Sequence, residues 1–156
     1  MSQTATTAET FIDGLDAGIG SIEGESEAIL ALRLEASRSF AATGVPTPKQ
    51  EEWRFTNLKA LAATPHDLGG PATADISPWR LTDSHRLVFV NGRFADTLSQ
   101  IGELPEGVTI GSLATALSAE NERAVFALGK GVDLESHPFA ALNTANFVDG
   151  AFIHLN

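Results

Sequence analysis

The stretch PTPKQEEWRFTNLKALAAT, residues 46–64, concentrates more specific local signals than any other part of the chain, and we call it the signature segment. Its TPKQ portion, residues 47–50, has the spacing of a capping box with proline at the first helical position. We therefore predict a short helix that runs through Trp53. Thr56 is expected to cap a second short helix, NLKALA at 57–62. Helix capping thus explains much of the polar content of the segment without any catalysis.

The aromatic side chains of the signature segment have two interpretations. In one, Trp53 and Phe55 form a stacking platform for a ligand, with the cationic Arg54 between them. In the other, both aromatic rings anchor the junction of the two helices in the core, and Arg54 pairs with Glu51. We favour the second interpretation, in which the segment is architectural.

The segment before it is the clearest long helix of the chain. The sequence EAILALRLEASRSFAAT, residues 27–43, carries apolar side chains at helical spacing, and Gly44 with the following Val45-Pro46 ends the pattern. The expected apolar face is broad and consists of Ile29, Leu32, Ala36 and Phe40, widened by Leu30 and Leu34. We expect residues 1–24, which are rich in Thr, Ala, Gly, Ser and acidic residues, to form a mobile tail.

Downstream of the signature segment the sequence predicts a β-hairpin. Residues 64–84 have the composition of an irregular connection. Leu87 to Val90 then forms a strand, Asn91-Gly92 is a strong two-residue turn signal, and Arg93 to Ala95 forms the returning strand. Because an isolated hairpin is only marginally stable, this hairpin must pack on helices or join a sheet.

The last third of the chain alternates short strands and helices. GVTIGSLATAL (107–117) predicts a strand and a helix capped by Ser112, and NERAVFALGKG (121–131) predicts a helix capped by Asn121. HPFAALNTANF (137–147) predicts a helix with Pro138 in its first turn, and DGAFIHLN (149–156) predicts a turn and a strand. We expect this last strand to be unpaired, which is unfavourable at a chain end. The sequence therefore reads as the front part of a longer protein, or a piece cut from one.

Composition excludes several classes of function. The 156 residues carry a net charge of −10, with a pI near 4.7, which disfavours binding to nucleic acid or to an anionic membrane surface. There is no cysteine, so disulfides and thiolate ligands are excluded within this chain. No apolar run is long enough for a membrane span, and the N-terminus lacks the features of a signal peptide. We expect a cytoplasmic protein.

No motif for catalysis or metal binding emerges from the residues. The four histidines have none of the spacings of a metal site, and we interpret them as turn and cap residues: His66, His85, His137 and His154. The sequence has no nucleophile elbow, P-loop or dinucleotide-binding fingerprint. Adjacent Glu51 and Glu52 point in different directions on a helix and indicate a solvated face. We therefore predict no catalytic, cofactor-binding or metal-binding residue and no enzyme.

Three segments, in order, resemble the N-terminal part of the SufD branch of the SufB/SufD family of iron–sulfur cluster assembly subunits. They are VPTPKQEEWRFTNLKAL, RLVFVNGRF and HPFAALNTANFVDGAFIHL. The match runs from about residue 26 to the end, and Asn57 departs from the proline or aspartate that many relatives carry after the signature threonine. The residues that carry the resemblance are expected to have structural roles: Pro46, Thr47, Glu51, Trp53, Arg54, Phe55, Thr56, Asn91, Gly92, Pro138, Phe139 and Asn143.

The resemblance implies an α+β fold and a scaffold function. It implies an N-terminal helical domain with a β-hairpin and short helices at residues 25–147. Residues 148–156 would then start a truncated right-handed parallel β-helix. The implied function is that of a non-catalytic subunit of a SufB–SufC–SufD complex, whose partners SufB and SufC bind through parts mostly absent here. The chain itself would hold no cofactor, since the full complex handles the iron–sulfur cluster.

Two alternatives stay open on the residues alone. One is a stand-alone small α+β protein-interaction domain, in which the last strand is paired inside a closed sheet. The other is a small enzyme that uses His137 or His154 with a nearby carboxylate such as Asp149. The family interpretation instead leaves GAFIHLN at an edge with apolar side chains exposed, and predicts a piece that is marginally stable or self-associates.

Overall fold

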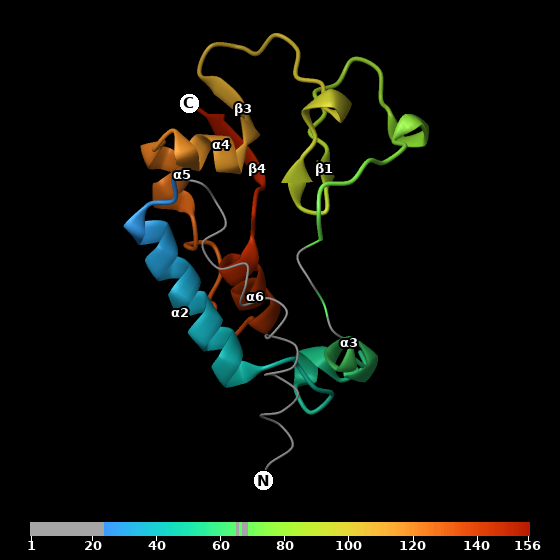
Figure 1. Cartoon of the computed structure of the whole chain (residues 1–156), viewed down its shortest axis with the longest axis vertical. Coiled ribbons are helices and arrows are strands. Elements are labelled where there is room, and N and C mark those ends of the chain that lie inside the picture. The colour runs from blue at the N-terminus through green and yellow to red at the C-terminus, as the bar shows by residue number, and fades with distance from the viewer. Residues whose placement is uncertain (1–23, 65, 67–68) are drawn as a thin grey trace. The chain divides into compact units, whose positions relative to one another are not determined.

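A computed structural model describes residues 24–64, 66 and 69–156, so the predicted tail lies almost wholly outside the described residues. These residues form an α+β fold with five α-helices and two small antiparallel sheets (Figure 1). The helices are α2 (Glu27–Thr43), α3 (Lys59–Ala63), α4 (Leu113–Ser118), α5 (Glu122–Ala127) and α6 (Pro138–Asn146). The strands are β1 (Phe89–Val90), β2 (Arg93–Phe94), β3 (Val108–Ser112) and β4 (Ala151–Leu155), with short 3-10 turns η2 (Glu51–Trp53), η3 (Ser77–Trp79) and η4 (Asp96–Leu98).

The described residues group into two compact units. Unit 1 contains residues 27–64, 66 and 127–146, and unit 2 contains residues 24–26, 69–126 and 147–156. Unit 1 is therefore built from two segments that lie far apart in the sequence.

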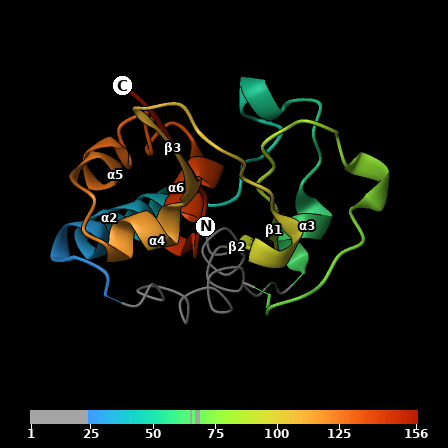
Figure 2. The same ribbon diagram turned by 90° about the horizontal axis from the view of Figure 1, so that it is seen from above.

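Unit 1 is held together by the packing of α2 on α6, which lie side by side (Figure 1, Figure 2). The predicted helix at 27–43 is confirmed. Phe40 and Ala141 are both fully buried at the centre of the contact, and Val45, Leu134 and Leu142 pack around them. The facing side chains of α6 are small, since Ala141 and Ala145 are its buried helical positions after Pro138. Small side chains let the two helices approach closely.

The apolar face of α2 is narrower than predicted. Leu30 and Leu34 are 41% and 39% exposed, so the widening of the face by these two residues is wrong. The physical reason is that, among the described helices, α6 is the one packed extensively on α2, and a single helix covers only a narrow stripe of its neighbour. Position 33, an arginine, lies in this stripe and is fully buried between Ile29 and Ala36.

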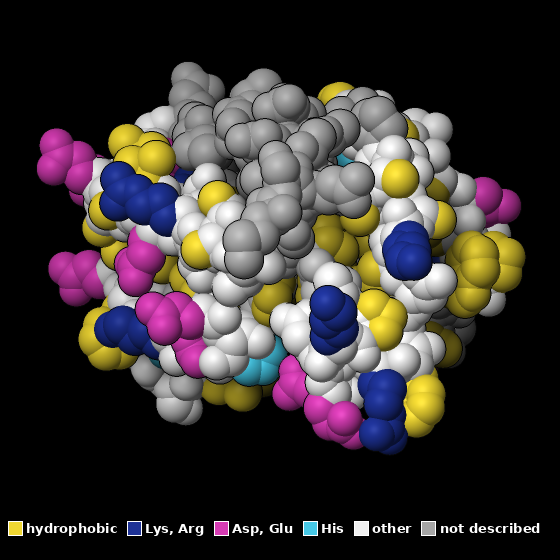
Figure 3. Space-filling model, turned by 90° about the horizontal axis from the view of Figure 1, so that it is seen from below, with side chains coloured by type: hydrophobic (Ala, Val, Ile, Leu, Met, Phe, Trp, Pro, Cys, Tyr) yellow, Lys and Arg dark blue, Asp and Glu magenta, His cyan; other side chains and the backbone are white. Residues whose placement is uncertain are grey.

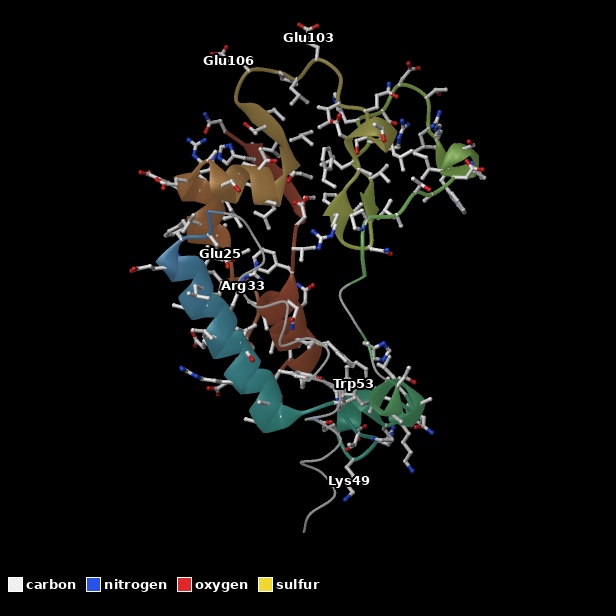
Figure 4. All side chains as sticks on the ribbon, in the orientation of Figure 1. Glu25, Arg33, Lys49, Trp53, Glu103 and Glu106 are labelled. Carbon is white, nitrogen blue, oxygen red and sulfur yellow. The ribbon has the colours of Figure 1, made fainter. Side chains whose placement is uncertain are left out.

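Arg33 is hydrogen-bonded to a carbonyl group of α6. Its Nη1 atom donates a hydrogen bond to the carbonyl oxygen of Ala145, at 3.1 Å, in the last turn of α6 (Figure 4). The last carbonyls of a helix have no partner within the helix and lie at the negative end of its dipole. The Arg33 guanidinium donates the hydrogen bond that the Ala145 carbonyl group lacks within the helix. Arg33 therefore joins α2 to the end of α6.

The signature segment adopts tighter turns than predicted. Only half of the capping box forms: the Gln50 side chain accepts a hydrogen bond from the Thr47 amide at 2.7 Å, and the following helix is the single 3-10 turn η2. The second helix, α3, begins at Lys59, and its cap comes from Asn57, whose Oδ1 accepts from the Lys59 amide. The prediction of Thr56 as the cap is therefore wrong, because an asparagine one residue later reaches the free amide.

The predicted β-hairpin is confirmed in unit 2. Strands β1 and β2 pair antiparallel, with Phe89 opposite Phe94 and Val90 opposite Arg93. Asn91 and Gly92 both have positive φ angles, 51° and 73°, which are the angles that a type I′ turn requires. An isolated bridge between Arg86 and Gln100 continues the pairing beyond the hairpin.

The second sheet of unit 2 corrects the prediction for the last strand. Strand β4 is paired antiparallel with β3 over five residue pairs, from Val108–Leu155 to Ser112–Ala151. The expectation of an unpaired terminal strand is therefore wrong. The expected exposure of its apolar side chains is confirmed, since Ile153 and Leu155 are 59% and 70% exposed. The two-stranded sheet is not closed, and its continuation into a parallel β-helix stays a prediction.

The helix caps of unit 2 follow the sequence closely. The Ser112 side chain accepts a hydrogen bond from the Thr115 amide at the start of α4. Asn121 Oδ1 accepts from the amides of Arg123 and Ala124 at the start of α5. Among the helices of the described residues, none is long and apolar enough to span a membrane.

Candidate functional site

The most highly connected polar group of unit 2 is the carboxylate of Asp149, in the turn before β4. Its Oδ1 accepts hydrogen bonds from the Ser112 hydroxyl at 2.8 Å and from the Ala114 and Gly150 amides at 2.9 and 2.8 Å. Its Oδ2 accepts from the Phe94 amide in β2 at 3.0 Å. We call this group the Asp149 cluster. A single side chain thereby joins the hairpin, the start of α4 and the last strand.

The Asp149 cluster is structural in its chemistry. A carboxylate with four donors has little acceptor capacity left for a substrate proton or for a metal ion. The hydrogen bonds to ionised acceptors are also the stronger kind, so they fix the relative position of β2 and β4. From the sequence alone, Asp149 is a candidate only as a catalytic partner for histidine, and its structural role is not apparent. The local Asp-Gly signal indicates only a turn, whereas the donors from Phe94, Ser112 and Ala114 lie in distant segments.

The histidines do not form a pair with Asp149. His137 Nδ1 contacts the Asp133 carbonyl oxygen at 2.9 Å, and His154 Nδ1 contacts the Arg123 guanidinium at 3.2 Å. His85 Nδ1 accepts a hydrogen bond from the Gly102 amide, and His66 Nε2 lies 3.0 Å from the Leu61 carbonyl oxygen. All four contacts involve backbone groups or arginine. Within the described residues, His137 and His154 therefore contact groups other than Asp149, and the hypothesis of a catalytic pair with Asp149 is wrong.

The signature segment is brought into contact with α6 through one aromatic pair. The Trp53 ring meets the Phe139 ring edge-on, with centroids 5.3 Å apart and an interplanar angle of 67° (Figure 4). This edge-to-face geometry is the favourable arrangement of two aromatic rings. Trp53 is half-buried, so its predicted anchoring role agrees with the structure. The contact also brings together two of the three segments that carry the family resemblance.

Phe55 contradicts the prediction that both aromatic rings are anchored in the core. Its side chain is 89% exposed. The predicted pairing of Arg54 with Glu51 is confirmed, with an N–O distance of 3.1 Å, and the same guanidinium lies 4.5 Å from the centroid of the Phe55 ring. The 3-10 turn η2 is tight, and the two aromatic side chains leave it in different directions. Trp53 faces α6, whereas Phe55 faces solvent.

The other residues of the resemblance occupy turns and helix ends. Pro46 and Pro138 are buried, whereas Thr56 and Asn143 are exposed. The Asn91 side chain donates a hydrogen bond to the Gly70 carbonyl oxygen at 3.0 Å and so ties the hairpin turn to the preceding connection. These positions carry no reactive chemistry in the structure.

Among the described residues, two aspartates have a lowered pKa, and both lie in local turns. The pKa of Asp133 lies below its usual value because the Ser136 hydroxyl and then the Glu135 amide donate hydrogen bonds to the carboxylate. The pKa of Asp75 is lowered in the same way by Ser77. Both groups are fully exposed, and each shift is explained within three residues along the chain. Neither shift indicates a catalytic site.

The described residues offer no group of three or more His, Asp or Glu side chains that could hold a metal ion. The whole sequence contains no cysteine. The prediction that this chain holds no cluster or cofactor of its own remains a prediction.

Two comparisons with known proteins bear on this arrangement. Residues 80–156 match a family described as the SufBD protein N-terminal region. This match contains both sheets and every residue of the Asp149 cluster. The chain is also 30% identical over 138 residues to an iron–sulfur cluster assembly SufBD family protein of Synechocystis sp.. That alignment covers 85% of this chain and 30% of the relative, so the chain spans about a third of the relative's length.

Proposed function

Because the chain belongs to the SufB/SufD family, we propose that it acts as a non-catalytic scaffold subunit of the Suf iron–sulfur cluster assembly machinery. The observation that carries the proposal is the family match over residues 80–156, which coincides with the part of the chain that the Asp149 cluster holds together. Family membership supports a role in cluster assembly. The scaffold role in a SufB–SufC–SufD complex is the finer step that we add.

The side-chain chemistry supports a scaffold role over an enzymatic one. The best-connected carboxylate, Asp149, has its acceptor positions occupied by four protein donors. The imidazoles of His137 and His154 contact a backbone carbonyl and an arginine. In this proposal the chain positions other subunits, and the iron–sulfur cluster is cargo that the complete complex assembles.

The exposed face of the β3–β4 sheet supports the proposed place of this chain within a larger assembly. Residues directly opposite each other in antiparallel strands point to the same side of the sheet. Ile110 and Ile153 therefore share one face with Val108 and Leu155. A face of four apolar β residues, with Leu155 70% exposed, favours further protein packing on it. We propose that the β-helix of the family supplies that packing, while SufB and SufC join through regions outside this chain.

The test is a purification of the tagged natural gene product from its own cells, with the bound proteins quantified by mass spectrometry. We expect SufB and SufC in fixed ratio to the bait and absent from a tag-only control. A double substitution, His137→Ala with His154→Ala, should leave both the recovered complex and the cluster content of a reporter ferredoxin unchanged. Loss of cluster content with an intact complex would contradict the non-catalytic role.

The stand-alone interaction domain is the second candidate, and the pairing of β4 with β3 favours it to some degree. It predicts that no Suf protein copurifies with the natural product under any salt condition. That outcome would overturn the scaffold proposal while leaving the family membership of the chain intact.

A further inference from the structure

The exposed Phe55 is the least expected feature of unit 1. Its neighbour Trp53 packs on α6, yet the Phe55 side chain is 89% exposed. Burying a phenylalanine side chain stabilises a fold, and this fold forgoes that gain at position 55. Phenylalanine is among the aromatic residues that are enriched at protein–protein interfaces.

Arg54 packs against the Phe55 ring, and the two side chains together form a small exposed surface. Its guanidinium lies over one face of Phe55, 4.5 Å from the ring centroid, and is itself held by the ion pair with Glu51. The side chain of Arg54 is 54% exposed, so the cation stays accessible beside the ring. The opposite face of the ring is free, because most of the side chain is open to solvent. Arginine and aromatic side chains together are the residues most enriched at interaction hot spots.

Two further cations flank this pair in the signature segment. Lys49 and Lys59 are both exposed, and neither ammonium group forms an ion pair with a described residue. Lys49 points away from the ribbon (Figure 4), and in the view from below, Lys and Arg side chains lie among hydrophobic and acidic ones (Figure 3). The segment carries three cationic side chains against Glu51 and Glu52, in a chain whose net charge is −10. Its charge is therefore opposite in sign to that of the whole chain.

We propose that Phe55, Arg54, Lys49 and Lys59 form a docking surface for an acidic peptide segment of a partner protein that carries an apolar side chain. The apolar side chain would pack on the free face of the Phe55 ring. The acidic side chains would pair with the two unpaired lysines and with the outer edge of the Arg54 guanidinium. Charge complementarity selects this occupant, since the surface is locally positive and centred on an aromatic ring.

The range of electrostatic forces explains why a short acidic segment fits better than a long polyanion. At physiological ionic strength the Debye length is about 8 Å, so a short peptide mainly senses the local cations. A nucleic acid would extend over the remaining surface of the chain, where acidic residues predominate. The docking surface lies outside residues 80–156, which match the SufBD N-terminal region, and its test does not require the proposed scaffold function.

The test is fluorescence anisotropy with a labelled synthetic peptide in which Glu and Asp alternate with Leu and Phe. The full chain is expected to bind this peptide. Phe55→Ala, and separately Lys49→Glu with Lys59→Glu, should each weaken binding by about tenfold or more, as for a hot-spot residue. The matched control is Phe126→Ala, which removes a 71% exposed phenylalanine from α5 and should change the affinity by less than about twofold. Unchanged thermal melting of Phe55→Ala verifies that the variant folds.

Four outcomes would overturn the proposal. The first is equal weakening by Phe55→Ala and Phe126→Ala, and the second is equal binding of a peptide with Lys in place of the acidic residues. The third is peptide binding that becomes about tenfold tighter when Glu9, Asp13 and Asp16 of the same chain are changed to amides. That result would mean that these acidic residues of the chain itself compete with the peptide for the docking surface. The fourth is concentration-dependent sedimentation that Phe55→Ala abolishes, which would identify a second copy as the occupant.

Discussion

The signature segment and the Asp149 cluster show two ways in which a motif can be held in a fold. The signature segment carries strong local signals, and its Trp53 ring packs on Phe139 of α6. The Asp149 cluster carries a weak local signal, a single Asp-Gly turn, but joins three elements through four hydrogen bonds. The comparison teaches that a weak local signal can mark a side chain that joins several distant elements.

The largest expected effect comes from removing the carboxylate of the Asp149 cluster. Asp149→Ala should destabilise unit 2 by about 3 kcal/mol or more, because several partly buried donors lose a charged acceptor. Hydrogen bonds to charged groups contribute about 1.5–3 kcal/mol each, although their energies do not add. Native-state hydrogen exchange checks this directly, because the amides of Phe94, Ala114 and Gly150 should lose protection first. Asp149→Asn, which keeps one acceptor oxygen, is the matched control and should lose less.

If Asp149→Ala exchanges these three amides no faster than the wild type, the cluster does not hold the elements together. The contrast between the two regions would then disappear.

A smaller effect is expected from the aromatic contact of the signature segment. Trp53→Ala should cost about 2–3 kcal/mol, less than for a fully buried tryptophan, because Trp53 is only half-buried. A double-mutant cycle with Phe139→Ala should give a coupling energy of about 1 kcal/mol for the edge-to-face pair. Urea unfolding followed by circular dichroism measures both values.

Trp53→Phe is the conservative control and should recover part of the loss. Strict additivity of Trp53→Ala and Phe139→Ala would show that the two rings do not interact in solution.

The smallest expected effect concerns the turn that leads into α6. Ser136→Ala should raise the pKa of Asp133 towards its usual value, because the Ser136 hydroxyl is the main cause of its lowering. A carboxyl group with a lowered pKa in the folded state contributes stability above its unfolded pKa. That contribution is lost as the pH falls through the folded pKa. The wild type should therefore lose slightly more stability than Ser136→Ala as the pH falls below about 4.

An NMR titration of the Asp133 carboxyl group measures this shift. The matched substitution is Ser77→Ala, which should raise the pKa of Asp75 in unit 2 in the same way. An unchanged Asp133 titration in Ser136→Ala would contradict the assigned cause.

Features fixed by neighbouring residues could be predicted from the sequence. The Asn91-Gly92 turn and the caps at Ser112 and Asn121 depend on a few adjacent residues, and the structure confirms all three. The helix at 27–43 was also predictable, since its apolar spacing extends over several turns. Local conformation and capping therefore follow from local chemistry.

Features fixed by distant partners could not be predicted. The hydrogen bond of Arg33 depends on a carbonyl group 112 residues away, and the role of Asp149 depends on donors in β2 and at the start of α4. The exposure of Phe55 depends on the tightness of η2, where the capping box predicted a longer helix. The sequence contains each of these residues, but only the folded chain shows which distant groups they contact.

The pairing of α2 with α6 has a consequence for synthesis on the ribosome. Helix α2 is translated early, but the Ala145 carbonyl group that receives Arg33 follows 112 residues later. At a translation rate of about 5–20 residues per second, that interval is roughly 5–20 s. During this time Ile29 and Phe40 have no helix to pack on, and a charged side chain lies in their midst. The guanidinium of Arg33 keeps this nascent stripe less apolar and so reduces the risk of premature association until α6 leaves the exit tunnel.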